Sequence, residues 1–293
     1  MSAATSPYEM PAAHTEPARA PPLQRGDGVA EIGFARRGGE TVLAHLYQRT
    51  PLRVLFPRPA PGDLPAATLL TTSGGLAGGD RLSLSIQAEA GAAGSVTTAA
   101  AEKIYRSLGP PVTMTVKLAV AEGGRLDYLP QETILFDGAK LRRRVDALLA
   151  PDGCLLASEM VVFGRAARGE RFTRGLLHDA WRIRIGGRLV WADALRLEGD
   201  IAARLDEPAA FGGAAALALA LYVGADGAQH LPLARSLADA EGCHGSTTLV
   251  NGVLLARFLG ARADIVRRAL TRYLAGMRQA AGLPAALPRM WST

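Results

Sequence analysis

The sequence is poor in cysteine, in aromatic residues and in long apolar runs, and each shortage excludes a class of protein. Its two cysteines, Cys154 and Cys243, are too few and too far apart for a disulfide framework or a paired-cysteine zinc site. The longest apolar stretch, Phe211 to Ala225, is shorter than the ~20 residues that a membrane-spanning helix needs. Aromatic residues form 5% of the chain, too few for a base-stacking platform. We therefore expect no membrane and no nucleic acid among its partners.

Lysine is scarce as well, although the chain carries a net charge of +6. Three of the 33 basic residues are lysines. Such an arginine bias commonly reflects genome composition, and an acidic protein surface suits the excess charge as well as nucleic acid does. No charged segment followed by an apolar one opens the chain, so we expect a cytoplasmic protein. With 48% hydrophobic residues among 293, the whole chain cannot be disordered.

Composition divides the chain into a tail and one domain. Residues 1–28 are rich in proline and alanine and contain almost no large apolar side chains, which predicts a disordered tail. Residues 29–293 are predicted to form a single domain. Up to Leu205 this domain consists of short alternating or apolar runs separated by glycine, proline and aspartate, a pattern typical of β-strands.

One turn in this region predicts how side chains are distributed. Asp137-Gly138 separates the runs 133–136 and 141–145, as a tight hairpin would require. If the second run is a strand, its period of two places Lys140, Arg142 and Arg144 on one face, which is an ordinary solvated face in the simplest interpretation. The other face then holds Leu141, Arg143 and Val145.

The last third of the chain has a helical texture. Apolar residues recur at intervals of three and four over Ala263 to Ala280, while Arg267, Arg268, Arg272 and Arg278 take the remaining positions, which predicts an amphipathic helix. A shorter helix is predicted over Leu231 to Ala240. The final segment should be extended, and Trp291 so near its end suggests that it docks on the body of the domain.

A glycine-rich loop is the first candidate for chemistry. It contains Gly74, Gly75, Gly78, Gly79 and Asp80. A phosphate-binding loop of the nucleotide-binding type needs a lysine and a hydroxyl residue after the last glycine, whereas here an aspartate follows and would repel phosphate. We interpret the loop as a structural turn whose glycines adopt positive φ.

Metal ligands are the second candidate. The five histidines show no chelating spacing, and the adjacent pair Cys243 and His244 would point to opposite faces of a strand. Carboxylates do occur within apolar or turn-bounded segments, at Glu89, Glu132, Asp137, Glu159, Asp193, Glu198 and Asp200. They either pair with arginines such as Arg165, Arg184 and Arg196 or line a polar passage for a divalent metal.

Seven motifs carry a family resemblance. The most specific is LPQETILFDGAKLRR at 129–143. The others are TSGGLAGGDRL at 72–82, TTAAAEKIYR at 97–106, GRAARGE at 164–170, DALRLEG at 193–199, NGVLLAR at 251–257 and PRMW at 288–291. In order and spacing they span residues 30 to 293, and they resemble the urease accessory protein family called UreD, or UreH in some organisms. The tail falls outside this resemblance.

The resemblance implies a fold and a function. The fold would be mainly β, with packed or helically coiled sheets and about two helices in the C-terminal third. The protein would be no enzyme. It would assemble with UreF and the GTPase UreG, with a dimer possible within that complex, and dock on apo-urease during nickel insertion. No permanently bound cofactor is expected, only nickel in transit through the interior. The alternative is an enzyme that uses the Gly74–Gly79 loop on a phosphorylated substrate.

These considerations give two sets of candidate residues. Oxygen donors suit transit because thiolate and imidazole hold late first-row metals more tightly. The nickel candidates are therefore the carboxylates within or beside the family motifs: Glu132, Asp137, Glu159 and Glu198. The predicted partner surface is the arginine-flanked helix with the aromatic ending: Arg267, Arg268, Arg272, Tyr273 and Trp291.

Overall fold

The computed structural model describes residues 25–292. Most of the predicted tail, residues 1–24, lies outside the described residues, as does residue 293. The first strand begins at Asp27, within the last residues assigned to the tail. Asp80 holds its start, because the Gly26 amide donates to Asp80 Oδ1 at 2.8 Å.

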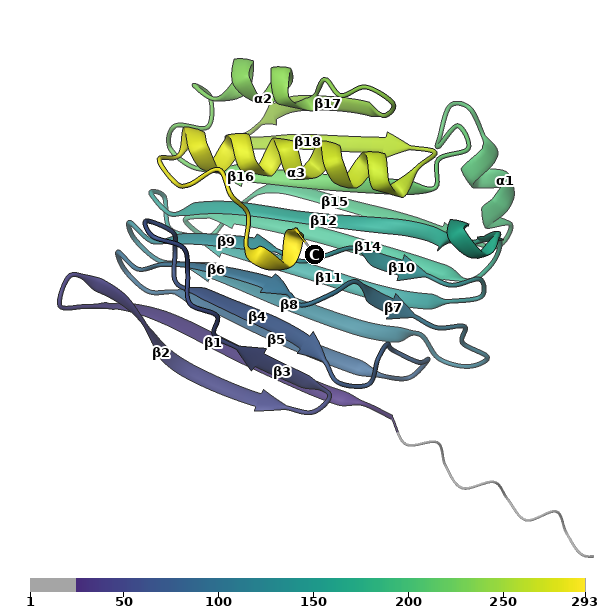
Figure 1. The fold of residues 1–293 in the computed structure, drawn as a ribbon, viewed down its shortest axis with the longest axis horizontal. Coiled ribbons are helices and arrows are strands. Elements are labelled where there is room, and N and C mark those ends of the chain that lie inside the picture. Colours follow the sequence, from purple (N-terminus) through teal and green to yellow (C-terminus); the bar gives the residue numbers. More distant parts are fainter. Residues whose placement is uncertain (1–24, 293) are drawn as a thin grey trace, which may run out of the picture.

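Two large sheets pack face to face (Figure 1). In spatial order the seven-stranded sheet contains β15 (Arg188–Glu198), β14 (Leu176–Ile185), β11 (Lys140–Leu149), β8 (Val112–Val120), β5 (Arg81–Ala88), β1 (Asp27–Arg37) and β2 (Glu40–Arg49). The path of the eleven-stranded sheet is β17 (His244–Val250), β18 (Val253–Gly260), β16 (Ala216–Val223), β12 (Cys154–Arg165), β9 (Arg125–Leu129), β6 (Ala93–Thr98), β4 (Ala66–Thr71) and β3 (Leu52–Leu55). Short strands β7 (Glu102–Ile104), β10 (Thr133–Leu135) and β13 (Glu170–Arg171) complete it.

The chain winds between the sheets as a coil. The inner strands β1, β5, β8, β11 and β14 run parallel to one another, as do β4, β6, β9 and β12 in the other sheet. Pairing in register stacks inward side chains in rows, so Val145 lies between Val116 and Trp181. The main core forms where the rows of the two sheets meet. The predicted β fold with helically coiled sheets is confirmed.

The turn at Asp137-Gly138 is not the predicted hairpin. The segment before it, β10, pairs in parallel with β7 and β12 in the larger sheet, whereas β11 belongs to the smaller one. Gly138, at φ +79°, therefore turns the chain from one layer to the other. The predicted distribution of side chains on β11 is correct, because Leu141, Arg143 and Val145 are buried between the sheets.

Three helices occur among the described residues: α1 (Ile201–Asp206), α2 (Leu231–Ala238) and α3 (Ala263–Ala280). The third has the predicted bounds, the second ends two residues early, and the first was not predicted. A single turn of 3₁₀ helix occurs at Ala166–Arg168 and another at Arg289–Trp291. In this part of the chain no helix is long and apolar enough to cross a membrane.

Helix α3 covers the outer face of the larger sheet, along β16 and β18 (Figure 1). No strand was predicted over β16, whose alanine-rich run places Ala216, Ala218 and Ala220 against this helical layer. Small side chains let the helix approach the sheet closely. This layer encloses a second core around Phe258 and Tyr273.

The end of α3 is held by buried charges. Arg278, which the helical period placed on the polar face, has no exposed surface. Its guanidinium binds Asp127 on β9 and Asp63 in the loop after β3. Asp127 is also fully buried and pairs with Arg125 at 3.1 Å. The placement of Arg278 was wrong because α3 ends above β9, where a buried carboxylate requires a cation.

The C-terminal segment docks as predicted, but the prediction that it is extended was wrong for Arg289–Trp291, which form a 3₁₀ turn. The Trp291 ring is buried, and its Nε1 donates to the Leu129 carbonyl at 3.1 Å. Arg267 donates to the Trp291 carbonyl, and its guanidinium lies 5.1 Å from the centre of the indole ring. The segment therefore joins α3 to the larger sheet.

A candidate functional site between the two sheets

The space between the sheets contains two cavities. The larger cavity, of about 180 Å³, lies between β3, β4 and β9 on one side and β5 and β8 on the other. The smaller cavity, of about 40 Å³, lies between β14 and β15 on one side and β12 and β16 on the other. Each one has exposed residues in its lining, Gly74 and Lys103 for the larger and Asp193 and Arg257 for the smaller. Each cavity thus reaches the surface at one end.

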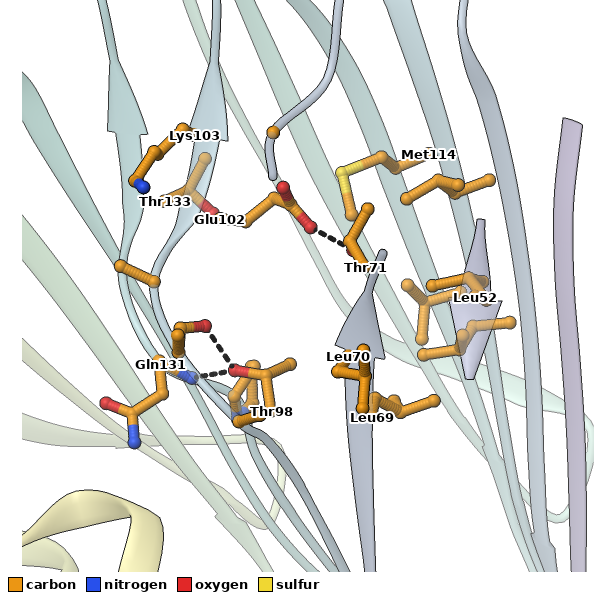
Figure 2. Close-up of a pocket in the computed structure, with 18 of the residues that line it drawn as sticks. Leu52, Leu69, Leu70, Thr71, Thr98, Glu102, Lys103, Met114, Gln131 and Thr133 are labelled. Atoms are coloured by element: carbon orange, nitrogen blue, oxygen red, sulfur yellow. Dashed lines mark hydrogen bonds between the residues drawn. The ribbon is translucent and has the colours of Figure 1, made fainter. Parts of the chain in front are cut away.

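Glu102 is the acidic residue that lines the larger cavity. It lies on β7, and Figure 2 shows its carboxylate directed toward Thr71, whose hydroxyl donates to Glu102 Oε2 at 2.5 Å. Burial raises the pKa of Glu102, because water is largely excluded from the carboxylate. The sequence offered one signal that was not used, a glutamate at the end of the apolar run 99–101 in a family motif.

A buried ion cluster lies at the boundary of the two cavities. Arg143 on β11 lines the larger cavity, while Glu159 on β12 and Asp179 on β14 line the smaller one. Arg143 Nε lies 2.9 Å from Asp179 Oδ1, and its Nη2 lies 3.0 Å from Glu159 Oε2. The remaining terminal nitrogen donates to the Thr133 hydroxyl at 3.1 Å. The exposed fractions of the Arg143 and Glu159 side chains are 7% and 13%. This cluster bridges the two sheets.

The cluster has two acids for one base, so Arg143 can balance the charge of only one of them. Burial raises the pKa of Glu159 to about 7, against the attraction of Arg143 and with the added repulsion of Asp179. With Glu159 protonated, Arg143 and Asp179 leave the cluster neutral. Trp181 Nε1 donates to Glu159 Oε2 at 2.7 Å and fixes the orientation of the carboxyl group.

The mouth of the smaller cavity carries a second ion pair. Asp193 on β15 and Arg257 on β18 are 2.6 Å apart, and both side chains are about half exposed. Their strands belong to different sheets, so the pair joins the two layers at the surface. Within the smaller cavity the acids Glu159, Asp179 and Asp193 come from three strands.

The four predicted nickel candidates do not converge. Glu159 alone lines one of the two cavities. Glu132 pairs with Arg267 of α3, on the outer side of the larger sheet. Glu198 ends β15 at the surface, where its hydrogen bond to Arg196 lowers its pKa. The proposal that Glu132 and Glu198 carry metal therefore gains no geometric support.

Asp137 has a local structural task. Its Oδ1 accepts bonds from the Thr173 amide and hydroxyl, each at 2.8 Å, and from the Arg174 amide at 3.2 Å. Partial burial opposes its ionisation, but these donors outweigh that effect and lower the pKa of Asp137. The carboxylate thus fixes the loop before β14. Among the described residues no group of three or more histidine, cysteine and acidic side chains is arranged to hold a metal ion.

The predicted partner surface is divided by the fold. Tyr273 and Trp291 are buried, and Arg267 is bound to Glu132 and to the Trp291 carbonyl. Arg268 stays on the surface and pairs with Asp264. Arg268 and Arg272 border an open groove of about 170 Å³ between α3 and the loop at Ala240 and Glu241. A partner that approaches α3 therefore meets these two arginines.

The glycine loop is part of the fold. Gly74, Gly75 and Gly79 have φ of +71°, +149° and +96°, as predicted. Gly78 does not, so its requirement is different: an added Cβ would lie 1.9 Å from Ser107 Oγ. The buried Asp80 carboxylate accepts bonds from the amides of Gly26 and Ala77, each at 2.8 Å. An acid inside the loop is incompatible with phosphate, so the enzymatic alternative finds no support.

Comparisons with known proteins agree with the family motifs of the sequence. The family model described as UreD urease accessory protein matches residues 26–292. A protein of Magnetococcus marinus named urease accessory protein UreD is 42% identical over 296 residues, which cover 99% of each chain. Proteins of the same name from a Methylobacterium species and from Rhodopseudomonas palustris are each 44% identical, over 93% and 91% of this chain and 97% and 93% of their own. The chain therefore belongs to the UreD family of urease accessory proteins.

Proposed function

We propose that this protein serves urease maturation as a scaffold that also conducts nickel through the space between its two sheets, with UreF and UreG as assembly partners and apo-urease as the recipient. Its role is that of an accessory protein and not of an enzyme. Nickel is the cargo in this proposal and needs no permanent site in the chain.

The observation that carries the proposal is that acidic side chains line both cavities. Both lie between the sheets and both reach the surface, the larger beside Gly74 and Lys103 and the smaller beside Asp193 and Arg257. Glu102 lines the first cavity, and Glu159, Asp179 and Asp193 line the second. A divalent cation that enters at one end would meet carboxylate oxygens along its way.

The donor type fits transit. Carboxylate oxygens bind nickel less tightly than thiolates and imidazoles do, so a cation bound to them is released more readily. Among residues 25–292, no cysteine or histidine lines either cavity. Transfer would therefore depend on successive weak contacts.

The test compares acids inside and outside the cavities. Glu102→Gln and Asp193→Asn should each lower the nickel occupancy of urease matured in cells, measured at equal abundance of the accessory complex. Glu198→Gln is the matched control, because this acid is exposed and lines neither cavity. Unchanged occupancy in the combined variant Glu102→Gln/Asp193→Asn would show that nickel does not travel between the sheets.

The partner role is tested on the exposed surface of α3. We expect Arg268→Ala/Arg272→Ala to weaken retention of UreF, because both guanidinium groups border the groove beside α3. Arg204→Ala is the control, since this arginine is equally exposed and lies on α1. Equal retention by all three proteins would place the UreF surface elsewhere.

A further inference from the structure

Arg143 is the side chain that separates the two cavities. It lines the larger one, and both of its acidic partners line the smaller one. In the sheet it lies between Met114 of β8 and Asp179 of β14, and from there it reaches across to Glu159 in the opposite sheet. The side chain therefore lies at the boundary between the two cavities.

Packing alone gives little reason for a base at this position. A buried ion cluster contributes little more to stability than apolar side chains of similar volume would, because desolvation offsets most of the attraction. The neighbours of Arg143 on the same face of β11, Leu141 and Val145, are apolar and fully buried. A leucine or methionine would suit the same row.

Arg143 hinders a cation by its positive charge as well as by the space that it occupies. Its guanidinium donates to both carboxylate oxygens of Asp179 and forms an ion pair with Glu159 Oε2, so these oxygens are already occupied. In a site shielded from water, its positive charge also repels an approaching divalent ion more strongly than it would at the surface. The position that best suits a passing cation is thus held by a cation of the protein itself.

We propose that Arg143 is a gate in the passage, closed while it binds Asp179 and Glu159 and open when its guanidinium moves into the larger cavity. The larger cavity adjoins the side chain and offers about 180 Å³, which is room for the displaced group. A passing divalent cation then takes the place of the guanidinium beside the two acids. This inference rests on the proposed function, since a gate requires a passage.

The first test removes the gate while keeping the charge balanced. Arg143→Met/Asp179→Asn deletes one base and one acid and keeps an unbranched side chain in place of the arginine. In the assembled accessory complex with apo-urease, we expect nickel to enter urease at least about threefold faster, because the electrostatic barrier is lost. The measurement is the initial rate of nickel gain by urease, from elemental analysis. Arg165→Met/Glu170→Gln is the control, an ion pair that lines neither cavity.

The second test leaves the acids without their base. Arg143→Met alone should turn the boundary into a trap, so that the purified protein retains at least about threefold more nickel after gel filtration than the original chain. Arg143→Lys should behave like the original chain, because it keeps a positive charge at the boundary. Retention of nickel needs no urease, which makes it independent of the loading rate.

The outcomes separate the gate from the passage. If folded Arg143→Met/Asp179→Asn and Arg143→Met change neither rate nor retention while Glu102→Gln/Asp193→Asn lowers loading, the passage stands and the gate is wrong. If Glu102→Gln/Asp193→Asn also has no effect, the proposed function itself has failed. Melting temperatures of all variants identify those that do not fold. If the methionine variants do not fold, Arg143→Lys decides, since a loading rate different from that of the original chain would contradict the gate.

Discussion

Replacement of Arg278 by methionine tests how the helical layer is attached to the sheets. Arg278 lies in the last turn of α3 and has no exposed surface. Its guanidinium binds both Asp127 and Asp63. Methionine is unbranched and fills most of the space of the arginine stem, so the change mainly removes charge and hydrogen bonds. It leaves Asp127 fully buried with Arg125 as its remaining partner.

The magnitude follows from the burial of these charges. Loss of one partner from a buried ion pair costs ~3–5 kcal/mol, because the remaining charge stays out of water without compensation. The contribution of Arg125 to Asp127 moderates the loss, so we expect Arg278→Met to lower the free energy of unfolding by about 3 kcal/mol. The loss of stability should affect α3 and β9 together, since the ion pair joins them.

The assay is urea unfolding of the purified chain, with Arg268→Met as the matched control on the same helix. Arg268 pairs with Asp264 at the surface, where solvent screens both charges, so its replacement should cost less than about 1 kcal/mol. A loss below about 1 kcal/mol for Arg278→Met, equal to that of the control, would refute the reasoning that α3 is anchored by buried charge.

Three further predictions concern stability. Gly78→Val should destabilise the chain far more than Gly74→Ala, since the added carbon meets a neighbouring loop at Gly78 but only open space at Gly74, where positive φ alone costs ~1–2 kcal/mol; equal thermal stabilities would contradict this. Trp291→Ala should cost ~3–5 kcal/mol in urea unfolding because the ring is buried on the sheet, and a change within experimental error would mean that the segment is not docked. The raised pKa of Glu159, about 7, means that the folded chain binds a proton that the unfolded chain has released, so its contribution to stability falls as pH rises from about 4.5 to 7. Glu159→Gln should abolish that slope in unfolding experiments across this range, and an unchanged slope would assign the titration to another group.

Local periodicity predicted the parts of the fold that depend on neighbouring residues. The bounds of α3 and the inward face of Arg143 follow from periods of 3.6 and two residues. Strand β16 was not predicted, because alanine occurs both in helices and in strands that a helix covers. The crossing at Asp137-Gly138 was missed because a glycine turn determines the direction of the chain but not which sheet receives it.

The candidate site depends on long-range placement, which explains why little of it could be predicted. Arg143, Glu159 and Asp179 lie on three strands, one of them in the opposite sheet. An acid on the apolar face of an alternating strand, as Asp179 is between Leu177 and Trp181, was the available signal for a buried partner. Glu132 and Glu198 were chosen because they lie in family motifs, and a motif does not say which side of a sheet a residue faces.

The strands inside the coil pair in parallel, but the strands at its ends pair antiparallel. Its inner strands are parallel, whereas β2 and β15 pair antiparallel at the two edges of the smaller sheet, and β3 and the strands after β12 do so in the larger sheet. Each inner turn contacts mainly the turn before and the turn after it, as in a one-dimensional lattice. Reversal at the edges stops this lattice, because a further parallel turn finds no matching neighbour. The number of turns, and with it the length of the space between the sheets, is therefore fixed by the terminal hairpins, and a variant could lengthen that space only by inserting a whole turn between them.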